Sequence, residues 1–460
     1  MNTIILISVI PIVLLYLGLY KAKKALLPVS IIGLIIALGL AITQWTTPDV
    51  AQPTFHGMLL FNNFSIAFSA ITITSTILIL LLSKGYFEKI SNHIAEYYAI
   101  ILFSLAGIVV MVSYYNLTML FIGIEIMSVS LYILAGIKKN DFASNEAALK
   151  YFLMGAFSTG FLLFGITLIY GATGSFHLDV IRDYALTTQH IDPIFYVGIV
   201  SIIVGLCFKV GAAPFHFWTP DVYEGSPTLI TAFMSTAVKT AGFAAFLRLF
   251  STCFVPLNTF WVPTLAIIAV ITLFIGNITA LYQQSFKRML AYSSISHAGY
   301  LLFAVIVIGA GSANAVFVYA TAYSIASIIA FGGLILVQQQ SGSDSFDSFN
   351  GLSAKNPFLA LVISIAMLSL AGIPLTAGFI GKFYMFSNVL TGHQVLLVVI
   401  AIVNAIISIF YYFRVIIAMY FRSAESTEVV VPGYYKFVLG ISALATIVIG
   451  IFPALISNLI

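Results

Sequence analysis

Long apolar runs, separated by short polar stretches, follow one another along almost the whole of the 460-residue chain. A run of about 20 apolar residues is long enough to cross a lipid bilayer as a helix. The pattern predicts about fourteen spans, near residues 3–20, 25–44, 61–83, 97–113, 116–137, 147–171, 194–220, 227–249, 261–282, 286–308, 314–338, 357–391, 395–421 and 434–457. The predicted fold class is therefore all-α, a polytopic membrane protein.

Composition supports this class and removes others. The chain is 61% hydrophobic and 7% charged, with a mean hydropathy of +1.10, well beyond what a soluble core requires. Its two cysteines, Cys207 and Cys253, are too few and too far apart to indicate a metal site or a disulfide framework. The net charge of +4 comes from loop residues that form no soluble patch, so anionic lipid is expected as the counterpart and nucleic acid is not.

Basic residues indicate how the spans are oriented, because Lys and Arg accumulate in cytoplasmic loops. Assigning alternate loops to the cytoplasm collects Lys21, Lys23, Lys24, Lys84, Lys89, Lys138, Lys139, Lys287, Arg288, Lys355 and Arg422. The opposite loops hold little beyond Arg182 and Arg248. The first run lacks the basic start and cleavage site of a signal peptide. We therefore expect it to be retained, with both chain termini on the outside.

Two apolar segments are unusually long and contain helix-breaking residues. Residues 193–220 and 357–390 would form helices of about 40 and 50 Å, longer than one crossing needs. The interrupting residues are Gly211 and Pro214 in the first segment and Gly372 and Pro374 in the second. Each segment is predicted to form two half-helices joined by unwound backbone, which survives at membrane depth only inside protein or beside water. Paired broken helices in two halves of a chain indicate an ion site.

Four charged residues lie within apolar stretches, where charge is expensive and a functional role is the default hypothesis. They are Glu125, Lys209, Lys239 and Lys382. One interpretation is a structural ion pair that holds helices together. The other is a switchable carboxylate–lysine pair that acts as a proton valve, because proximity of opposite charges favours the charged forms that burial disfavours.

Other polar residues are more ambiguous. His297 is either a proton relay, because imidazole both donates and accepts near neutral pH, or a hydrogen-bonded packing residue among serines. Lys287 and Arg288 are predicted to be interfacial anchors, and Glu146 and Lys150 to lie at headgroup level. Asp221 and Glu224 are expected in a cytoplasmic loop, solvated or lining a gate. In the sequence these polar residues lie, in the same order, in the segments SISHAGY, FKR, NEAALK and PDVYEG.

Three segments resemble a known family. FKVGAAPFHFWTPDVYEGSP, KRMLAYSSISHAGY and GIPLTAGFIGKFYMF closely resemble signature segments of the antiporter-like membrane subunits of respiratory complex I and of Mrp-type cation/proton antiporters. The resemblance covers nearly the whole chain. The short chain, the lack of a long lateral helix after the last span, and Lys382 where another subunit type carries glutamate favour one type among these subunits.

The resemblance implies a role for each buried charge. Glu125 would pair with Lys209, Lys239 would be the central relay, and Lys382 would connect to the periplasmic exit, with His297 between the last two. It also implies two inverted five-helix repeats, at residues 97–250 and 251–422, flanked by three helices at 1–96 and one at 423–460. These roles and boundaries are expectations taken from the family.

The function implied is that of a proton-translocating subunit of an NADH:quinone oxidoreductase, a translocase, in a bacterial inner membrane. Quinone reduction elsewhere in the complex would drive proton transfer along the charged residues. No cofactor or metal is expected in this chain, since FMN, iron–sulfur clusters and quinone would belong to partner subunits. The expected partners are other complex I membrane subunits, especially antiporter-like and small K-type and J-type ones. Two alternatives are a subunit of a multisubunit Na+/H+ antiporter and a structural scaffold.

Overall fold

The computed structural model describes residues 1–45, 51–91, 93–423, 429–457 and 459. Helices account for most of them, as the apolar pattern predicts. The α-helices are α1 (Asn2–Leu19), α2 (Lys23–Ile42), α3 (Asn63–Leu82), α4 (Ile94–Ser113), α5 (Leu117–Ala135), α6 (Phe142–Thr173), α7 (Leu178–Thr187), α8 (Pro193–Val210), α9 (Trp218–Gly225), α10 (Thr228–Phe233), α11 (Lys239–Leu249), α12 (Asn258–Leu281), α13 (Phe286–Ile306), α14 (Ser312–Ser341), α15 (Leu352–Lys355), α16 (Pro357–Ala371), α17 (Ala377–Thr391), α18 (Val395–Phe421), α19 (Gly433–Ile451) and α20 (Ala454–Ser457). The class of polytopic helical membrane protein is confirmed.

Among the described residues, 12 helical segments are long and apolar enough to cross a membrane. One of them, Thr228–Leu281, has 54 residues, more than twice the length that one crossing needs. The half-helix α16 is shorter than the other candidate spans. The number fourteen therefore stays a prediction, while the membrane-spanning character is plain.

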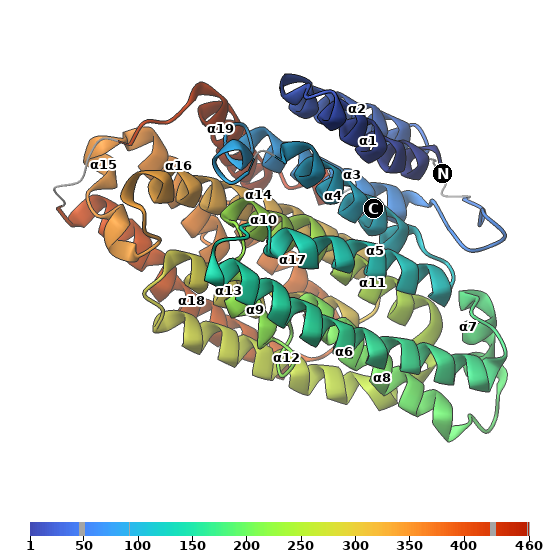
Figure 1. The fold of residues 1–460 in the computed structure, drawn as a ribbon. Coiled ribbons are helices and arrows are strands. Elements are labelled where there is room, and N and C mark those ends of the chain that lie inside the picture. Colours follow the sequence, from blue (N-terminus) through green and yellow to red (C-terminus); the bar gives the residue numbers. More distant parts are fainter. Residues whose placement is uncertain (46–50, 92, 424–428, 458, 460) are drawn as a thin grey trace.

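The helices lie roughly parallel to one another, with α1 and α2 at one edge of the bundle and α8 and α12 toward the opposite edge (Figure 1). Burial follows this arrangement: 94% of the most apolar window of α13 and of α14 is buried, against 28% for α1 and α2. The helices α13 and α14 thus form the centre of the bundle. Side chains on them are shielded from lipid on all sides, which is where polar groups can be held.

Both long segments are interrupted. The helix α8 ends at Val210 and is followed by Gly211 with φ +72°, and α16 ends at Ala371 and is followed by Gly372 with φ +83°. Both glycines adopt the left-handed conformation that ends helices and that glycine tolerates best. The chain resumes as α9 and α17 after irregular backbone at residues 211–217 and 372–376. Each interruption leaves a helix C-terminus inside the bundle.

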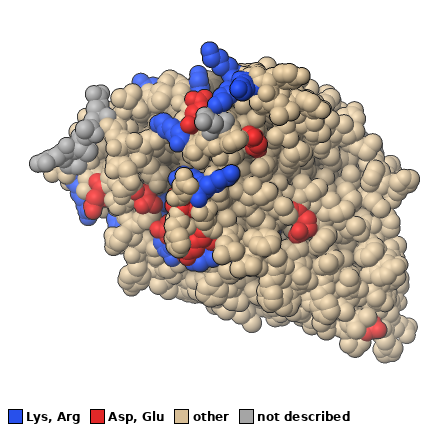
Figure 2. All heavy atoms as spheres, viewed as in Figure 1, with Lys and Arg blue, Asp and Glu red and all other residues tan. Residues whose placement is uncertain are grey.

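Charged side chains gather at one end of the molecule. On the face drawn in Figure 2, Lys and Arg cluster toward the end at which α15 lies in Figure 1, and the rest of the visible surface has few charges. We call this the Lys-rich end. It contains the connecting segments after α1, α3 and α5, which carry Lys21, Lys84, Lys89, Lys138 and Lys139. The short helix α7, which the sequence did not indicate, lies at the opposite end (Figure 1).

Arg248 corrects one sequence expectation. It was expected in a loop, but it lies in α11 with 6% of its surface exposed. Its guanidinium donates to Asn62 Oδ1 at 2.9 Å, to Ser65 Oγ at 2.7 Å and to the Tyr114 carbonyl at 3.0 Å. Arginine carries five donors in a planar fork, so a buried site with several acceptors can hold it. The basic-loop pattern could not reveal acceptors that come from other helices.

The helices α4 and α5 approach each other unusually closely. A Cβ atom at Gly123 would lie 2.8 Å from the Met111 nitrogen and 3.0 Å from the Gly107 carbonyl oxygen. Small residues that let backbones touch are the usual means of packing helices in lipid, where no hydrophobic effect drives helices together. The contact fixes α5, which carries Glu125 two residues further on.

Gly123→Ala should separate α4 from α5 and lower the stability of the protein by about 1 to 3 kcal/mol, the usual cost of overpacking. Gly160→Ala is the matched control, because a Cβ atom at this helical glycine would meet nothing within 4 Å. Thermal unfolding of the purified protein in detergent measures both. Equal melting temperatures for the two variants would show that the contact does not hold the helices together.

Candidate functional site

The predicted site residues lie along the interior of the bundle, beginning at the first helix break. Lys209 is in the last turn of α8, 8% exposed, and its Nζ donates to Ser128 Oγ at 2.5 Å. The Tyr151 ring centroid lies 6.0 Å from the same Nζ. A hydroxyl and an aromatic face therefore replace part of the water that the ammonium loses on burial.

Glu125 does not form an ion pair with Lys209 in this structure. Its Oε1 is buried and has no hydrogen-bond partner among the described residues. Ser128 follows Glu125 by one helical turn, on the same face of α5, and its hydroxyl takes the Lys209 ammonium instead. The Lys209 ammonium thus bonds to a hydroxyl one helical turn from Glu125 and not to the carboxylate itself.

Lys239 occupies the centre of the bundle. It is 5% exposed and begins α11 directly after a π-helical segment, Met234–Val238; such segments are frequent at functional sites. Its Nζ donates to the Ser294 hydroxyl at 2.5 Å and also to the Ser294 backbone carbonyl. The Tyr323 ring centroid is 5.9 Å from Nζ. The residues that hold Lys239 thus come from α13 and α14, the most buried helices.

Lys382 lies beside the second break. It is 5% exposed, and its Nζ donates to the Ala371 carbonyl at 2.7 Å. Ala371 is the last residue of α16, so the ammonium sits at a helix C-terminus, where unpaired carbonyls and the helix dipole favour positive charge. The Tyr300 ring centroid lies 5.3 Å from Nζ. In an unbroken helix this carbonyl would accept from a backbone N–H group, so the break is what makes it available to Lys382.

His297 connects the surroundings of Lys239 to those of Lys382. Its ring centroid is 4.7 Å from that of Tyr323 and 6.1 Å from that of Tyr300, and these are the rings that contact Lys239 and Lys382 respectively. Both ring nitrogens have hydroxyl partners: Nδ1 with Tyr319 at 2.6 Å and Nε2 with Tyr412 at 3.1 Å. The imidazole can therefore accept a proton at one nitrogen while the other donates.

A small cavity of about 10 Å³ lies beside His297, bordered by Tyr319 and Tyr323 and, at the second break, by Ser369 and Gly378. This space corresponds to roughly one water molecule. Its walls offer hydroxyl groups and a ring nitrogen, which are the partners that a buried water requires. The cavity thus lies between the histidine and the ends of α16 and α17 that flank the second break.

Within the described residues, no carboxylate lies at ion-pair distance from Lys209, Lys239 or Lys382. Every ion pair found there involves other residues. A permanently charged ammonium at such depth would normally be paired. Lysines held only by hydroxyls and carbonyls are suited to gaining and losing a proton, since neither partner fixes the charged form as firmly as a carboxylate does.

The sequence alone did not single out several groups that the fold brings to this site. His216 lies in the first break and is 5% exposed, and its Nδ1 has no hydrogen-bond partner among the residues that the structure describes. The buried tyrosines Tyr300, Tyr319, Tyr323 and Tyr412 surround His297. In the sequence these tyrosines look like the many others of the chain, and only their three-dimensional placement distinguishes them.

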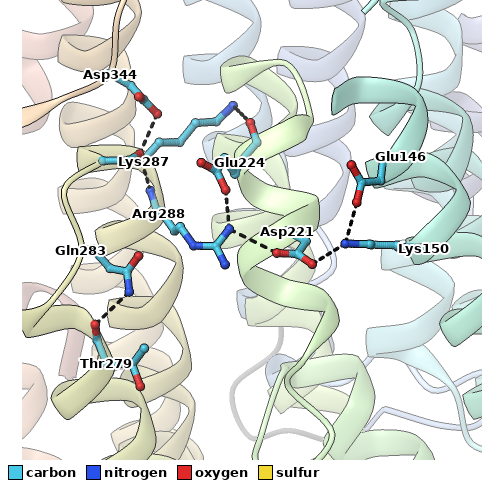
Figure 3. Close-up of polar contacts among 10 residues, drawn as sticks. Glu146, Lys150, Asp221, Glu224, Thr279, Gln283, Lys287, Arg288 and Asp344 are labelled. Atoms are coloured by element: carbon cyan, nitrogen blue, oxygen red, sulfur yellow. Dashed lines mark hydrogen bonds and ion pairs between the residues drawn. The ribbon is translucent and has the colours of Figure 1, made fainter. Parts of the chain in front are cut away.

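The charged residues near the Lys-rich end also differ from expectation (Figure 3). Asp221 and Glu224 are in helix α9 and not in a loop. Arg288 bonds to both of them, and Lys150 bonds to Asp221 at 2.7 Å. Lys287 was expected to be an interfacial anchor, but it is 4% exposed. The reason is that the end of α9 supplies backbone carbonyls to it, a partner that the sequence does not reveal.

Comparison with known proteins gives concordant results. A family model described as "NADH:quinone oxidoreductase/Mrp antiporter, TM" matches residues 115–408. The chain is 43% identical over 456 residues to NADH-quinone oxidoreductase subunit N of Cytophaga hutchinsonii, with 98% of each chain covered. It is 40% identical over 461 residues to the protein of the same name from Flavobacterium psychrophilum, with 100% of each covered.

Solved structures agree with these sequence relatives. A chain of respiratory complex I from Thermus thermophilus matches with a TM-score of 0.85 and 31% identity, covering 99% of this chain and 98% of that one. A chain of the Mrp complex from Dietzia sp. matches with a TM-score of 0.88 and 18% identity, covering 99% and 95%. At that lower identity the second likeness concerns the fold alone.

Gly372→Ala should displace the Lys382 side chain, so that its ammonium no longer donates to the Ala371 carbonyl. A Cβ atom at residue 372 would lie 2.7 Å from Lys382 Cδ and 3.1 Å from its Nζ, and the residue has φ +83°. A cryo-electron microscopy map of the variant should show Lys382 Nζ beyond hydrogen-bond distance of the Ala371 carbonyl. Gly160→Ala serves again as the control, and an unchanged Lys382 position in Gly372→Ala would contradict the expectation.

Proposed function

Because the chain belongs to the NADH:quinone oxidoreductase/Mrp antiporter family of membrane subunits, we propose that its interior row of lysines carries protons across the membrane. The chain is a proton-translocating membrane subunit of the NADH:quinone oxidoreductase type, and its relatives are subunit N. It is part of a translocase, and the redox reaction takes place outside this chain. The proposal concerns which residues carry the protons and how.

The observation that carries the proposal is the order of contacts between Lys239 and Lys382. Each lysine faces one of two tyrosine rings, and His297 touches both rings. Proton transfer between groups requires hydrogen-bond distance or one intervening water, and the hydroxyls of Tyr319 and Tyr412 and the cavity beside His297 would supply such steps around the histidine. A proton would thus pass from Lys239 through the His297 cluster to Lys382.

The driving force proposed is electrostatic. When a signal from quinone reduction moves Lys209 from Ser128 onto Glu125, the positive charge is neutralised and its effect on the proton affinity of Lys239 changes. The buried Oε1 of Glu125, which has no hydrogen-bond partner among the described residues and lies one helical turn from the hydroxyl that binds Lys209, supports such a switch. Coupling of this kind uses a chain of neighbouring charges and needs no large displacement of helices.

Glu125 also bears on the partners of the chain. It is partly exposed, and α5 presents large apolar side chains at Ile122, Ile126, Val129 and Ile133 along the adjacent surface. A carboxylate facing lipid would be costly, so we propose that another membrane subunit covers it. An antiporter-like neighbour or a small K-type or J-type subunit fits this position. The complex would lie in a bacterial inner membrane with both termini of this chain on the periplasmic side.

Two inverted repeats remain part of the proposal, at residues 97–250 and 251–422, with residues 1–96 and 423–460 outside them. Each proposed repeat contains a half-helix that ends at a left-handed glycine, Gly211 or Gly372, with a lysine contact close by. Each also contains one helix of 30 residues or more, α6 or α14. These paired features are what a duplicated unit would carry.

Lys239→Ala should abolish most redox-coupled proton pumping, because the central group of the row is removed. Lys24→Ala, at an exposed position in the first turn of α2, is the matched loss of a lysine and should leave pumping unchanged. Proton uptake by the reconstituted complex during NADH-driven quinone reduction measures both. Normal pumping in Lys239→Ala, with assembly intact, would favour the scaffold interpretation.

Glu125→Gln should lower pumping by about 10-fold or more while the complex still assembles, since one electrostatic coupling is typically worth about 1 to 3 kcal/mol. The amide keeps the shape of the side chain and loses only its charge. Native electrophoresis of the complex reports assembly, and the same uptake assay reports pumping. A fully active Glu125→Gln complex would rule out the switch while leaving the lysine row in place.

A further inference from the structure

The short helix α9 is held at its outer end by charges from two neighbouring helices (Figure 3). Asp221 bonds to Lys150 of α6 at 2.7 Å and to Arg288 of α13 at 3.1 Å, and Arg288 also bonds to Glu224. Lys150 is further paired with Glu146 at 2.8 Å. We call these five residues the clamp. It spans the gap from α6 across α9 to α13.

The residue next to Arg288 holds the same helix from the inside. The Lys287 Nζ donates to the Glu224 carbonyl at 2.8 Å and to the Ser226 carbonyl at 2.5 Å. These carbonyls are at the C-terminal end of α9, where a cation is favoured by the helix dipole. Two consecutive residues of α13 thus bind α9: Arg288 pairs with its carboxylate side chains, and Lys287 donates to its backbone carbonyls.

Two hollows flank the end of α9 at the Lys-rich end. One has a volume of about 370 Å³ and is bordered by Lys287, Ser226 and Lys138, and the other has about 250 Å³ and is bordered by Lys150 and Arg288. Glu224 and Gly225 line both. The end of α9 is therefore the partition between two spaces large enough for several water molecules.

Between the two clamp carboxylates of α9, Tyr223 points toward the surroundings of the central lysine. Tyr223 is 2% exposed, and its side chain lies near the Ser294 hydroxyl of α13. Ser294 is also the residue that accepts from Lys239. Helix α9 thus carries two clamp residues, Asp221 and Glu224, and also Tyr223, which lies near the partner of Lys239.

We propose that α9 is the gate through which protons reach Lys239 from the Lys-rich end, and that Arg288 and Lys287 are positioning residues that keep it closed. This inference rests on the proposed function, since it assigns the uptake side of the same lysine row. When the clamp opens, the end of α9 moves away from α6 and α13. Water from the two hollows then passes Tyr223 and reaches the Ser294 hydroxyl.

The exposure of the clamp suits a gate better than a structural tie. Its five side chains are between 30% and 45% exposed, and ion pairs with that much contact to water are individually weak. Salt screens them further. Gly225 allows a tight seal in the closed state, because a Cβ atom there would lie 2.3 Å from the Ala143 carbonyl oxygen of α6.

Ser226→Cys provides a reporter of opening. Ser226 is 1% exposed, borders the larger hollow, and its hydroxyl has no partner among the described residues, so sulfur in its place should disturb little. The whole complex in membranes is treated with a small, neutral, water-soluble maleimide. The parent chain, whose Cys207 and Cys253 are buried, gives the background rate.

The Ser226→Cys thiol should react slowly, and adding Arg288→Gln or Asp221→Asn should raise the rate by up to about fivefold, the factor that one weak ion pair contributes. High salt should raise the labelling rate of the Ser226→Cys thiol without any further substitution, because salt screens the ion pairs of the clamp. Arg182→Gln is the control, because it removes a partly exposed arginine that is paired with Asp179 and Asp183 on α7, at the opposite end.

Unchanged labelling in both clamp variants and in high salt would overturn the gate, whether or not the lysine row pumps protons. Lys239→Ala separates the two proposals, because it should abolish pumping without altering the labelling rate. If labelling responds to the clamp but Lys239→Ala pumps normally, the gate stands as a moving part and the proposed proton row fails. An equal acceleration by Arg182→Gln would mean that the clamp has no special role and would also overturn the gate.

Discussion

The structure depends on how positive charge is kept inside a bundle that excludes water. Lys209, Lys239 and Lys382 are each buried, and among the described residues none has a carboxylate at ion-pair distance. Desolvating an ammonium is costly unless other polar groups replace the water. Here serine hydroxyls, backbone carbonyls and aromatic faces do so. Such partners tolerate both the charged and the neutral amine, which a fixed ion pair would not.

The irregular backbone follows from the same requirement. A continuous helix uses its own carbonyls, whereas a helix that ends within the bundle leaves its last carbonyls unpaired. The Ala371 carbonyl takes the Lys382 ammonium in this way, and the carbonyls at the end of α9 take Lys287. The left-handed Gly372 ends α16 at the depth where Lys382 needs an acceptor. The breaks are therefore part of the charge chemistry as well as of the fold.

Charges at the centre and at the Lys-rich end are built differently. In the centre, the polar groups around His297 are tyrosine and serine hydroxyls in a buried, closely packed region. At the end, the clamp consists of oppositely charged side chains that remain partly in water. The first arrangement favours proton transfer over short fixed distances, and the second favours small movements, because solvated ion pairs break easily. Helix α9 touches both, which gives the two regions a mechanical connection.

The sequence by itself determined the class of fold, the positions of the two breaks and the family, because apolar length, glycine and proline act locally and are visible in one dimension. It also marked Glu125, Lys209, Lys239, His297 and Lys382, since charge within an apolar run is conspicuous. Only the tertiary structure decided what these groups touch. Ser128, and not Glu125, accepts from Lys209, Arg248 finds acceptors on other helices, and Lys287 is buried against the end of α9. Each of these contacts joins residues from different helices, so their hydrogen-bond partners are set by packing and leave no periodic signal in the chain.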